Sequence, residues 1–266
     1  MQQNDLFDVV VLGASNEGIA LCEYIKTKAP EKNVALVSRH FNFVKPNNKL
    51  ADTVLITGDS AFSSYVKGLV VLTLKNKKTV CGKNLVIATG ATPIKTTTLK
   101  NNNICYSPRD LKPAKMKPAI VYGDGTTAVK YSLQMAKKFK YVYLCSDTFK
   151  LNCESKLARR LNDTANIVHL PNCHITTCKN NKDGNLCEVT LDTYDTINCS
   201  ALVMALGRMP DVNGIDTKMV ELDQDRYIKI NSLHQTTKVP NIYAIGECTR
   251  HNTKRSITTV GSRLVR

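Results

Sequence analysis

The sequence has no long apolar run, no secretory leader pattern and no CxxC pair of cysteines. No apolar stretch approaches the roughly 18 residues that a membrane-spanning helix needs. The longest apolar runs, residues 9–12 and 201–206, have the length of buried strands. The polar residues 1–5 precede a strand pattern and contain no secretory h-region. We therefore expect a cytoplasmic chain that does not enter a membrane.

The cysteines also lack the spacing of a metal or dithiol site. None of the ten forms a CxxC pair, so free thiols in a reducing compartment are expected. The nearest approach to a cluster is residues 173–178, where Cys173, His174 and Cys178 lie in a Thr-rich strand pattern. No fourth ligand is evident there, and we predict no metal site. A Ser/His/Asp triad, paired catalytic carboxylates and an H-E-x-x-H motif are also missing.

Acidic residues are few relative to basic ones. The 266 residues include 37 Lys and Arg but 22 Asp and Glu, which gives a formal net charge of +15. Such a surface would attract an acidic protein. It could also reflect a simple preference for surface lysine. The basic residues are spread along the chain without interleaved aromatics, so nucleic acid is a disfavoured partner.

Alternating strand and helix patterns predict an α/β fold, because two βαβ units occur, each opened by a glycine turn. Residues 41–60 have a weak pattern and are predicted to be loop. A 42% hydrophobic content agrees with a globular chain of one large or two ordinary domains. The expected strands are residues 8–12, 34–37, 68–74, 84–89, 119–122, 141–145, 200–206, 227–230 and 242–245, with an antiparallel meander over 173–197. The expected helices are residues 18–28, 126–138 and 155–165, with a final helix that runs into the C-terminus.

The first glycine turn has the sequence context of a dinucleotide fingerprint. Gly13 would make the tight turn, Gly18 would let the helix pack on the strand, and the helix N-terminus would attract a pyrophosphate. However, Ser15 replaces the middle glycine, and Arg39 stands where an acid would hold a ribose hydroxyl. An ordinary strand–helix turn is therefore an open alternative.

The second turn, residues 123–128, fits the pattern G-x-G-x-x-A between a strand and a helix. Asp147 follows the next strand and is well placed to accept a hydrogen bond from a ribose 2′-hydroxyl. This acid favours NADH over NADPH, although Lys150 lies close in sequence.

Three further strand ends are interleaved in the sequence with the two glycine turns. They are residues 88–93, 205–211 and 242–247, and residues 255–262 follow the last of them. With them the chain resembles, over nearly its whole length, the two-dinucleotide flavoproteins of the pyridine nucleotide-disulfide oxidoreductase family, in the thioredoxin-reductase-like branch. The resemblance implies two Rossmann-like domains and the cofactors FAD and NAD(P)H. It places a discontinuous, trimmed FAD domain at 1–104 and 214–266 and an NAD(P)H domain at 105–213. It also implies a homodimer. The residues implied for FAD are Gly13, Ser15, Gly18, Arg39, Thr89, Gly90, Gly246, Glu247, Ile257 and Thr258. Those implied for NAD(P)H are Gly123, Gly125, Thr126, Thr127, Ala128, Asp147 and Gly207.

The chain departs from this family at the redox dithiol. The region before the second glycine turn keeps Cys105 but has no second cysteine three residues away. A dithiol relay needs two sulfurs that can bond. Disulfide reductase activity of the usual kind is therefore not expected, and Cys105 is a weak candidate for a lone redox thiol. No other catalytic residue is identified, since flavin chemistry would be borne by the cofactor.

Two functions remain open. The first is an FAD-dependent NAD(P)H oxidoreductase that passes electrons to an unknown acceptor such as flavodoxin, ferredoxin, a quinone or oxygen. Residues 248–266 carry Arg250, Lys254, Arg255, Arg263 and Arg266 without an acid and form a candidate docking face. The second is a degenerate dinucleotide-binding protein with little or no FAD and a sensor or interaction role. The altered positions around Gly13 and Gly246 favour the second function.

Overall fold

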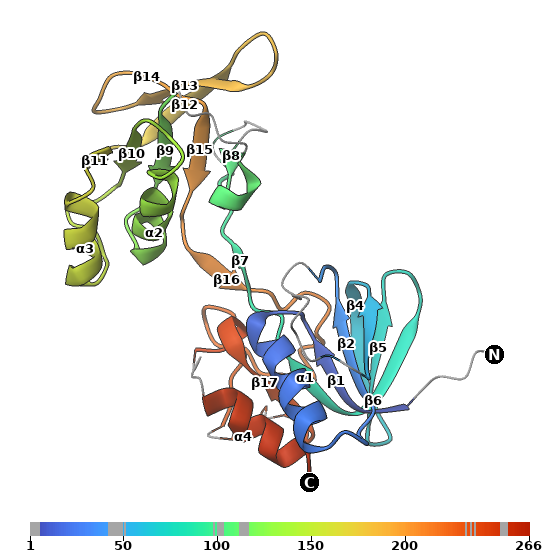
Figure 1. Ribbon diagram of the computed structural model, residues 1–266. Helices are drawn as coiled ribbons and strands as arrows, with labels where there is room; N and C mark the ends of the chain where they lie inside the picture. Colours follow the sequence, from blue (N-terminus) through green and yellow to red (C-terminus); the bar gives the residue numbers. More distant parts are fainter. Residues whose placement is uncertain are drawn as a thin grey trace. The chain divides into compact units, whose positions relative to one another are not determined.

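The computed structural model describes residues 6–41, 50, 52–97, 99, 104–111, 117–231, 233–234, 236, 238–250 and 255–266. The chain forms two compact units, one made of Met1–Thr92 with Met209–Arg266 and the other of Pro93–Arg208 (Figure 1). These boundaries fall earlier in sequence than the ones predicted at 104/105 and 213/214. The first unit is discontinuous, as the resemblance implied.

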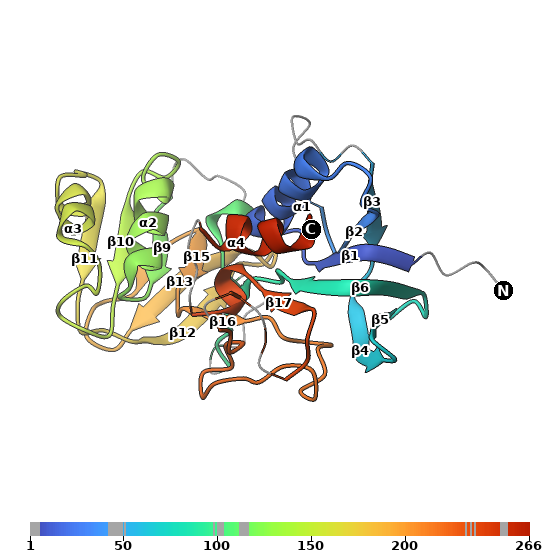
Figure 2. The ribbon, with the colours of Figure 1, turned by 90° about the horizontal axis from the view of Figure 1, so that it is seen from below.

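The first unit contains a seven-stranded sheet with the order β3-β2-β1-β6-β5-β4, and β17 also pairs with β6. β1, β2, β3, β17 and the end of β6 run parallel, whereas β4 and β5 add an antiparallel meander to the start of β6. Figure 2 shows β1 and β6 side by side. The strands are β1 (Leu6–Leu12), β2 (Val34–Ser38), β3 (Thr53–Thr57), β4 (Ser60–Val66), β5 (Leu69–Leu74), β6 (Thr79–Ile87) and β17 (Ile242–Ala244).

Helices α1 (Asn16–Lys28) and α4 (Arg255–Leu264) pack together on one face of this sheet (Figure 1). Leu21 and Ile25 of α1 and Val260 of α4 are fully buried there. The opposite face is covered by apolar residues of the segment 212–230, among them Met219. Burial on both faces explains why β1 and β2 are nearly continuous apolar runs.

The second unit is built on a parallel sheet with the order β11-β10-β9-β15-β8. Helices α2 (Thr126–Met135) and α3 (Ser155–Asn162) pack on one face. The antiparallel sheet of β12, β13 and β14 shares the other hydrophobic cluster. The strands are β8 (Ile104–Cys105), β9 (Ala119–Tyr122), β10 (Val142–Cys145), β11 (Ile167–Leu170), β12 (Ile175–Asn180), β13 (Leu186–Leu191), β14 (Ile197–Asn198) and β15 (Ala201–Met204).

Two short strands, β7 (Ala91–Pro93) and β16 (Arg208–Pro210), pair with each other where the chain passes between the units. The Ile94 N–H donates to the Gly207 carbonyl at 3.1 Å, and the Asp211 N–H donates to the Gly90 carbonyl at 3.0 Å. Both unit boundaries, 92/93 and 208/209, therefore fall within this two-stranded sheet.

The predicted α/β class is confirmed, with two corrections. Thr53–Thr57 is a strand although loop was predicted for residues 41–60, because its apolar run of three residues, 54–56, is short and belongs to a largely exposed edge strand. Residues 227–230 make only isolated bridges, from Ile228 to Leu222 and from Ile230 to Thr236, instead of the predicted strand. Within the part of the chain that the structure describes, no helix has the length and apolar character needed to cross a membrane.

Candidate dinucleotide-binding sites

The turn between β1 and α1 has the close approach that a dinucleotide fingerprint requires. Gly13 has φ +110°, and a side chain there would overlap the Ala88 carbonyl at the end of β6. A side chain at Gly18 would likewise overlap the Gly13 carbonyl. Ser15 is the N-cap of α1, and its hydroxyl accepts from the Gly18 N–H at 3.1 Å. The serine therefore occupies one of the N–H groups of the helix N-terminus that could bind a phosphate.

The second part of this site is Gly246, which has φ +80°. The Glu17 side chain covers it, with Oε2 3.3 Å from the position that a Cβ at residue 246 would take. The resemblance assigns Gly246 to the pyrophosphate and ribityl region of FAD. A carboxylate at this point would repel a pyrophosphate. Sequence reasoning missed Glu17, although an acid inside the glycine turn was a visible signal.

Thr89 and Gly90 follow β6 and meet the first turn from the other side. The Thr89 Oγ1 atom is buried and, within the described part of the chain, hydrogen-bonds to no nitrogen or oxygen atom. It lies beside the Cys248 thiol. Gly90 has φ +69° and open space where a side chain would be. A buried hydroxyl of this kind fits a site that is completed by a bound group.

Arg39 has a partner inside its own unit. It donates from Nη2 to the carboxylate of Asp211, which is 5% exposed, and its Nε lies 3.7 Å from Asp59 Oδ1. Asn213 donates to the same Asp211 carboxylate at 2.9 Å. The guanidinium is thus held by two carboxylates of the first unit. These contacts account for Arg39 without a role toward a ribose.

The remaining residues that the resemblance assigned to FAD are more dispersed. Glu247 is exposed, in the short 3-10 helix Gly246–Cys248. Ile257 packs against the hydrophobic cluster under α1 and α4, and the Thr258 hydroxyl donates to the Arg255 carbonyl at 3.0 Å. The structure brings Gly13, Thr89 and Gly246 around one helix N-terminus. It does not join Arg39 or Thr258 to them by any contact in the described residues.

The turn between β9 and α2 repeats the geometry of the first turn. Gly123 has φ +140°, and a side chain there would meet the Ala205 carbonyl at the end of β15. Gly125 is the N-cap of α2, has open space in place of a side chain, and caps the helix without a side-chain hydrogen bond. The N–H groups of the first turn of α2 are therefore open to a phosphate. Here the middle glycine is present, and the backbone fits a dinucleotide better than it does at Ser15.

The other residues predicted for NAD(P)H lie on the same helix or near it. Thr126 and Thr127 open α2 and are partly exposed, whereas Ala128 is buried against the sheet. Gly207 has φ +99° and lies beside Ile94. The Asn152 N–H donates to the Asp124 carbonyl at 2.7 Å and fixes the turn from the segment after β10.

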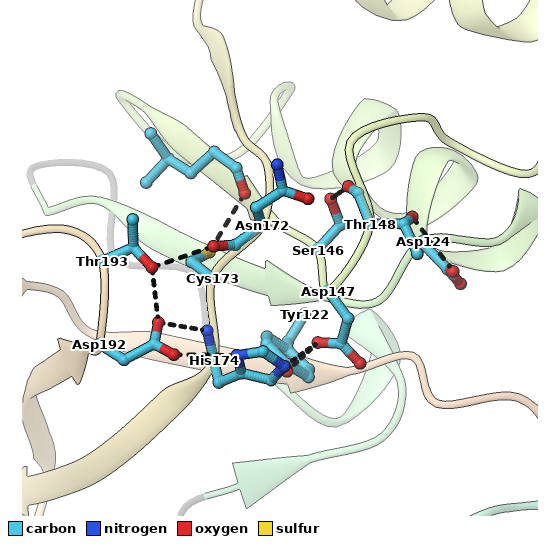
Figure 3. Close-up of polar contacts among 11 residues, drawn as sticks. Tyr122, Asp124, Ser146, Asp147, Thr148, Asn172, Cys173, His174, Asp192 and Thr193 are labelled. Carbon is cyan, nitrogen blue, oxygen red and sulfur yellow. Dashed lines mark hydrogen bonds and ion pairs between the residues drawn. The ribbon is translucent and has the colours of Figure 1, made fainter.

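Asp147 lies just beyond the end of β10, where the sequence placed an acid for a ribose. Its carboxylate accepts a hydrogen bond from the Tyr122 hydroxyl at the end of β9 (Figure 3). Burial and then this hydrogen bond raise the pKa of Tyr122, so the phenol stays protonated and donates. Asp147 is 53% exposed and accessible to a ligand.

Sequence reasoning missed the residue that faces Asp147. His174 Nε2 lies 3.9 Å from Asp147 Oδ1, and His174 Nδ1 lies 2.9 Å from Asp192 Oδ2. The Asp192 hydrogen bond and, less strongly, the Asp147 charge raise the pKa of His174 above its usual value. The backbone N–H and then the imidazole of His174 lower the pKa of Asp192 to about 2. No sequence spacing joins these residues, because the turns around β12 and β13 bring them together.

The cysteines do not form a dithiol or a metal site in the described residues. None of the ten is in a disulfide, and no group of three or more His, Cys, Asp or Glu side chains there has metal-binding geometry. Burial and then the charge of Asp110 raise the pKa of Cys105, which disfavours its thiolate. Burial raises the pKa of Cys22 and Cys248 to about 12. These thiols are unreactive in the protonated form.

The fold reduces the net positive charge of the candidate docking face at 248–266, because it places acidic residues beside Arg250. Arg250 is paired with Asp223 and Asp225 and lies over the Tyr227 ring. Its charge is therefore compensated by acids that the C-terminal sequence itself lacks. Arg255, Arg263 and Arg266 are exposed, while Lys254 lies outside the described residues.

The chain is similar to known proteins over most of its length. The family model described as pyridine nucleotide-disulphide oxidoreductase matches residues 16–262. A ferredoxin–NADP reductase of Orientia tsutsugamushi (strain Ikeda) is 23% identical over 229 residues, which cover 79% of this chain and 66% of that protein. An NADH dehydrogenase of Ferdinandcohnia aciditolerans is 24% identical over 208 residues, 74% of this chain and 39% of that protein. The chain thus spans less than two thirds of the length of these relatives.

Solved structures share the fold. A thioredoxin reductase of Lactococcus lactis aligns with a TM-score of 0.81 at 16% identity and covers 97% of this chain and 95% of its own. The thioredoxin reductase of T. acidophilum aligns with a TM-score of 0.80 at 19% identity, with 98% and 99% covered. The two-unit architecture with Rossmann-like sheets is therefore confirmed.

Proposed function

Because the chain belongs to the pyridine nucleotide-disulphide oxidoreductase family, whose members use FAD and NAD(P)H, we propose that it is an FAD-dependent NAD(P)H oxidoreductase that works without a redox dithiol. The observation that carries this proposal is the pair of glycine cradles. Gly13 turns against Ala88 in one unit, and Gly123 turns against Ala205 in the other. Two such turns in one chain suit two dinucleotides.

In this proposal the first unit holds FAD through the backbone around Gly13 and through Thr89, whose buried hydroxyl would gain a partner. The second unit holds NAD(P)H at the open N-terminus of α2, and Asp147 receives the adenine ribose. Bound FAD supplies the chemistry, which is acceptance of a hydride from reduced nicotinamide and release of the electrons to a final acceptor. The chain's own contribution is to bind and orient the two cofactors.

The absence of a dithiol relay is supported by Cys105. Its sequence neighbours include no cysteine within three residues, and its raised pKa disfavours the thiolate that disulfide exchange requires. We expect a Cys105→Ser variant to oxidise NAD(P)H within twofold of the parent rate, with Cys153→Ser as the matched loss of a half-buried thiol. A loss of more than tenfold confined to Cys105→Ser would make Cys105 a redox participant.

The acceptor in this proposal is an acidic electron-carrier protein, flavodoxin or ferredoxin. The net charge of +15 would attract it, and relatives named ferredoxin–NADP reductase support the same class. Oxygen or a quinone is the competing acceptor. Reduction of an acidic carrier should slow steeply as salt rises, whereas reduction of oxygen should not.

A second candidate function is favoured by Glu17. Its carboxylate over Gly246 would weaken FAD binding and leave a protein that holds NAD(H) in a sensor or interaction role. The first test of both functions is the visible spectrum of the purified chain, before and after anaerobic NADH. A two-band flavin spectrum that bleaches with NADH supports the oxidoreductase. A colourless protein that fails to take up added FAD would contradict it and favour the second function.

A further inference from the structure

The side chains of Tyr122, Asp147, His174 and Asp192 lie close together just beyond the end of β10 (Figure 3). Tyr122 comes from the end of β9, Asp192 follows β13, and His174 precedes β12. The Asp192 carboxylate also accepts from the His174 backbone N–H at 2.8 Å, and the Thr193 hydroxyl donates to it at 3.0 Å. Asp192 is therefore fixed in place and orients the imidazole.

The position of Asp192 decides which imidazole nitrogen titrates. An ionised carboxylate only accepts hydrogen bonds, so Nδ1, 2.9 Å from Asp192, carries a proton in both charge states. The proton that His174 gains or loses is therefore on Nε2. That atom faces Asp147 at 3.9 Å, and both side chains are more than half exposed, at 61% for His174 and 53% for Asp147.

The two states of Nε2 offer different partners to a nucleotide. When His174 is neutral, Asp147 and Nε2 are both acceptors, and they match the 2′-hydroxyl of NADH, which donates. When His174 is protonated, Nε2 becomes a donor with positive charge, and a 2′-phosphate gains a partner beside Asp147. We propose that His174 makes the choice between NADH and NADPH depend on pH, with NADPH tolerated only when Nε2 is protonated. This inference rests on the proposed function, in which Asp147 receives the ribose.

The paired acid and the neutral groups around His174 make the charge of His174 itself the one that changes with pH. Asp147 and Asp192 are the acids that face it, and the hydrogen bonds from His174 lower the pKa of Asp192 to about 2, so Asp192 keeps its charge. Tyr122 stays protonated, as argued above. Cys173 adjoins His174 in the sequence and contacts Cys145, and burial raises the pKa of both thiols, so both are neutral. Since the usual histidine pKa is about 6.5 and that of His174 is raised, His174 is protonated below about pH 6.5 and loses this charge as pH rises through the raised pKa.

The test uses two stable nucleotide fragments, adenosine 5′-monophosphate and adenosine 2′,5′-bisphosphate, which differ by the 2′-phosphate. Their Kd values are measured by titration calorimetry with the full chain and with His174→Asn, at about pH 5.5 and about pH 8. The 2′-phosphate itself titrates near pH 6, and the variant corrects for that effect. His174→Lys supplies a permanent charge, and His40→Asn, which removes an exposed histidine of the other unit, is the control for loss of a histidine.

At the lower pH we expect the bisphosphate, relative to the monophosphate, to bind about five- to tenfold better to the parent chain than to His174→Asn. At the higher pH the two proteins should agree within twofold. His174→Lys should keep the advantage at both pH values, and His40→Asn should match the parent. If both fragments bind but parent and His174→Asn show the same pH profile, the inference is wrong and the proposed function stands. If neither fragment binds at any pH, both fail.

Discussion

The Glu17 carboxylate lies over Gly246, with Oε2 3.3 Å from the point where a Cβ at residue 246 would be. Glu17 comes from the first turn of α1, and Gly246 begins the 3-10 helix that follows β17, so the contact joins the two segments that would hold FAD. The acid stabilises the N-terminus of α1 through the helix dipole. The same charge is unfavourable for a pyrophosphate at that N-terminus.

Replacing Glu17 should therefore strengthen FAD binding. We expect Glu17→Gln to tighten the Kd for FAD about three- to tenfold by removing a repulsive charge near the phosphates. Stability should fall by about 0.3–1 kcal/mol, because the interaction with the helix dipole is lost. Fluorescence titration with FAD measures the first effect. Glu31→Gln makes the same charge change at an exposed position beyond the other end of α1 and should leave FAD binding unchanged. Weaker FAD binding in Glu17→Gln would show that the carboxylate assists the cofactor.

The Gly13 turn should tolerate no side chain. Gly13→Ala combines a positive φ with an overlap on the Ala88 carbonyl, and we expect a loss of about 3 kcal/mol or more in unfolding free energy. Gly68 has φ +85° but open space around it, so Gly68→Ala should cost only about 1–2 kcal/mol. Urea unfolding of the two variants separates conformational strain from steric overlap. Equal losses would mean that Gly13 is kept for its φ alone.

The ion pair between Arg39 and the buried Asp211 should be structural. Among the described residues, Arg39→Ala leaves the Asp211 carboxylate with its hydrogen bonds from Asn213, and we expect a cost of about 1–3 kcal/mol in unfolding free energy. Lys75 is 68% exposed and pairs with Asp59 at 2.5 Å, so Lys75→Ala should cost less than about 1 kcal/mol. Urea midpoints of both variants give the comparison. A stable Arg39→Ala variant that has lost FAD binding would instead assign Arg39 to the cofactor.

The His174–Asp192 pair should make stability depend on pH. Because the folded pKa of His174 is raised, its protonated form adds stability below about pH 6.5, and that contribution is lost as pH rises through the folded pKa. His174→Asn should therefore be destabilised relative to the parent at about pH 5.5 and much less at about pH 8.5. Burial lowers the pKa of His169, so His169→Asn should show the opposite trend. Denaturant midpoints at both pH values check the signs, and identical profiles for the two variants would contradict this pairing.

The pH range over which the contribution of Asp192 to stability changes lies lower than that of His174. Its pKa of about 2 is below the usual 3.8, so its contribution is present above about pH 4 and is lost as pH falls toward 2. Asp192→Asn should reduce the steepness of acid unfolding between these values. Asp195, an exposed acid near Asp192 in the sequence, provides the control as Asp195→Asn.

Local pattern was enough to predict the parts of the fold with strong periodicity and glycine punctuation. The apolar runs at β1, β9 and β15 mark buried parallel strands, and the turns at Gly13 and Gly123 mark their crossings to helices. Thr53–Thr57 escaped prediction because it is a short edge strand that pairs with β2, and its apolar residues 54–56 are only partly covered, so they show no alternation. The strand predicted at 227–230 did not form beyond isolated bridges, although it has the right composition.

The sequence by itself determined the α/β class, the two glycine turns and the place of Asp147 after a strand, because each depends on residues close together in the chain. Only the tertiary structure decided what faces those residues. Glu17 over Gly246, Asp211 beside Arg39 and His174 beside Asp147 are contacts across 229, 172 and 27 positions of the sequence. Such contacts arise when separate segments pack on shared sheets, and no local spacing encodes them.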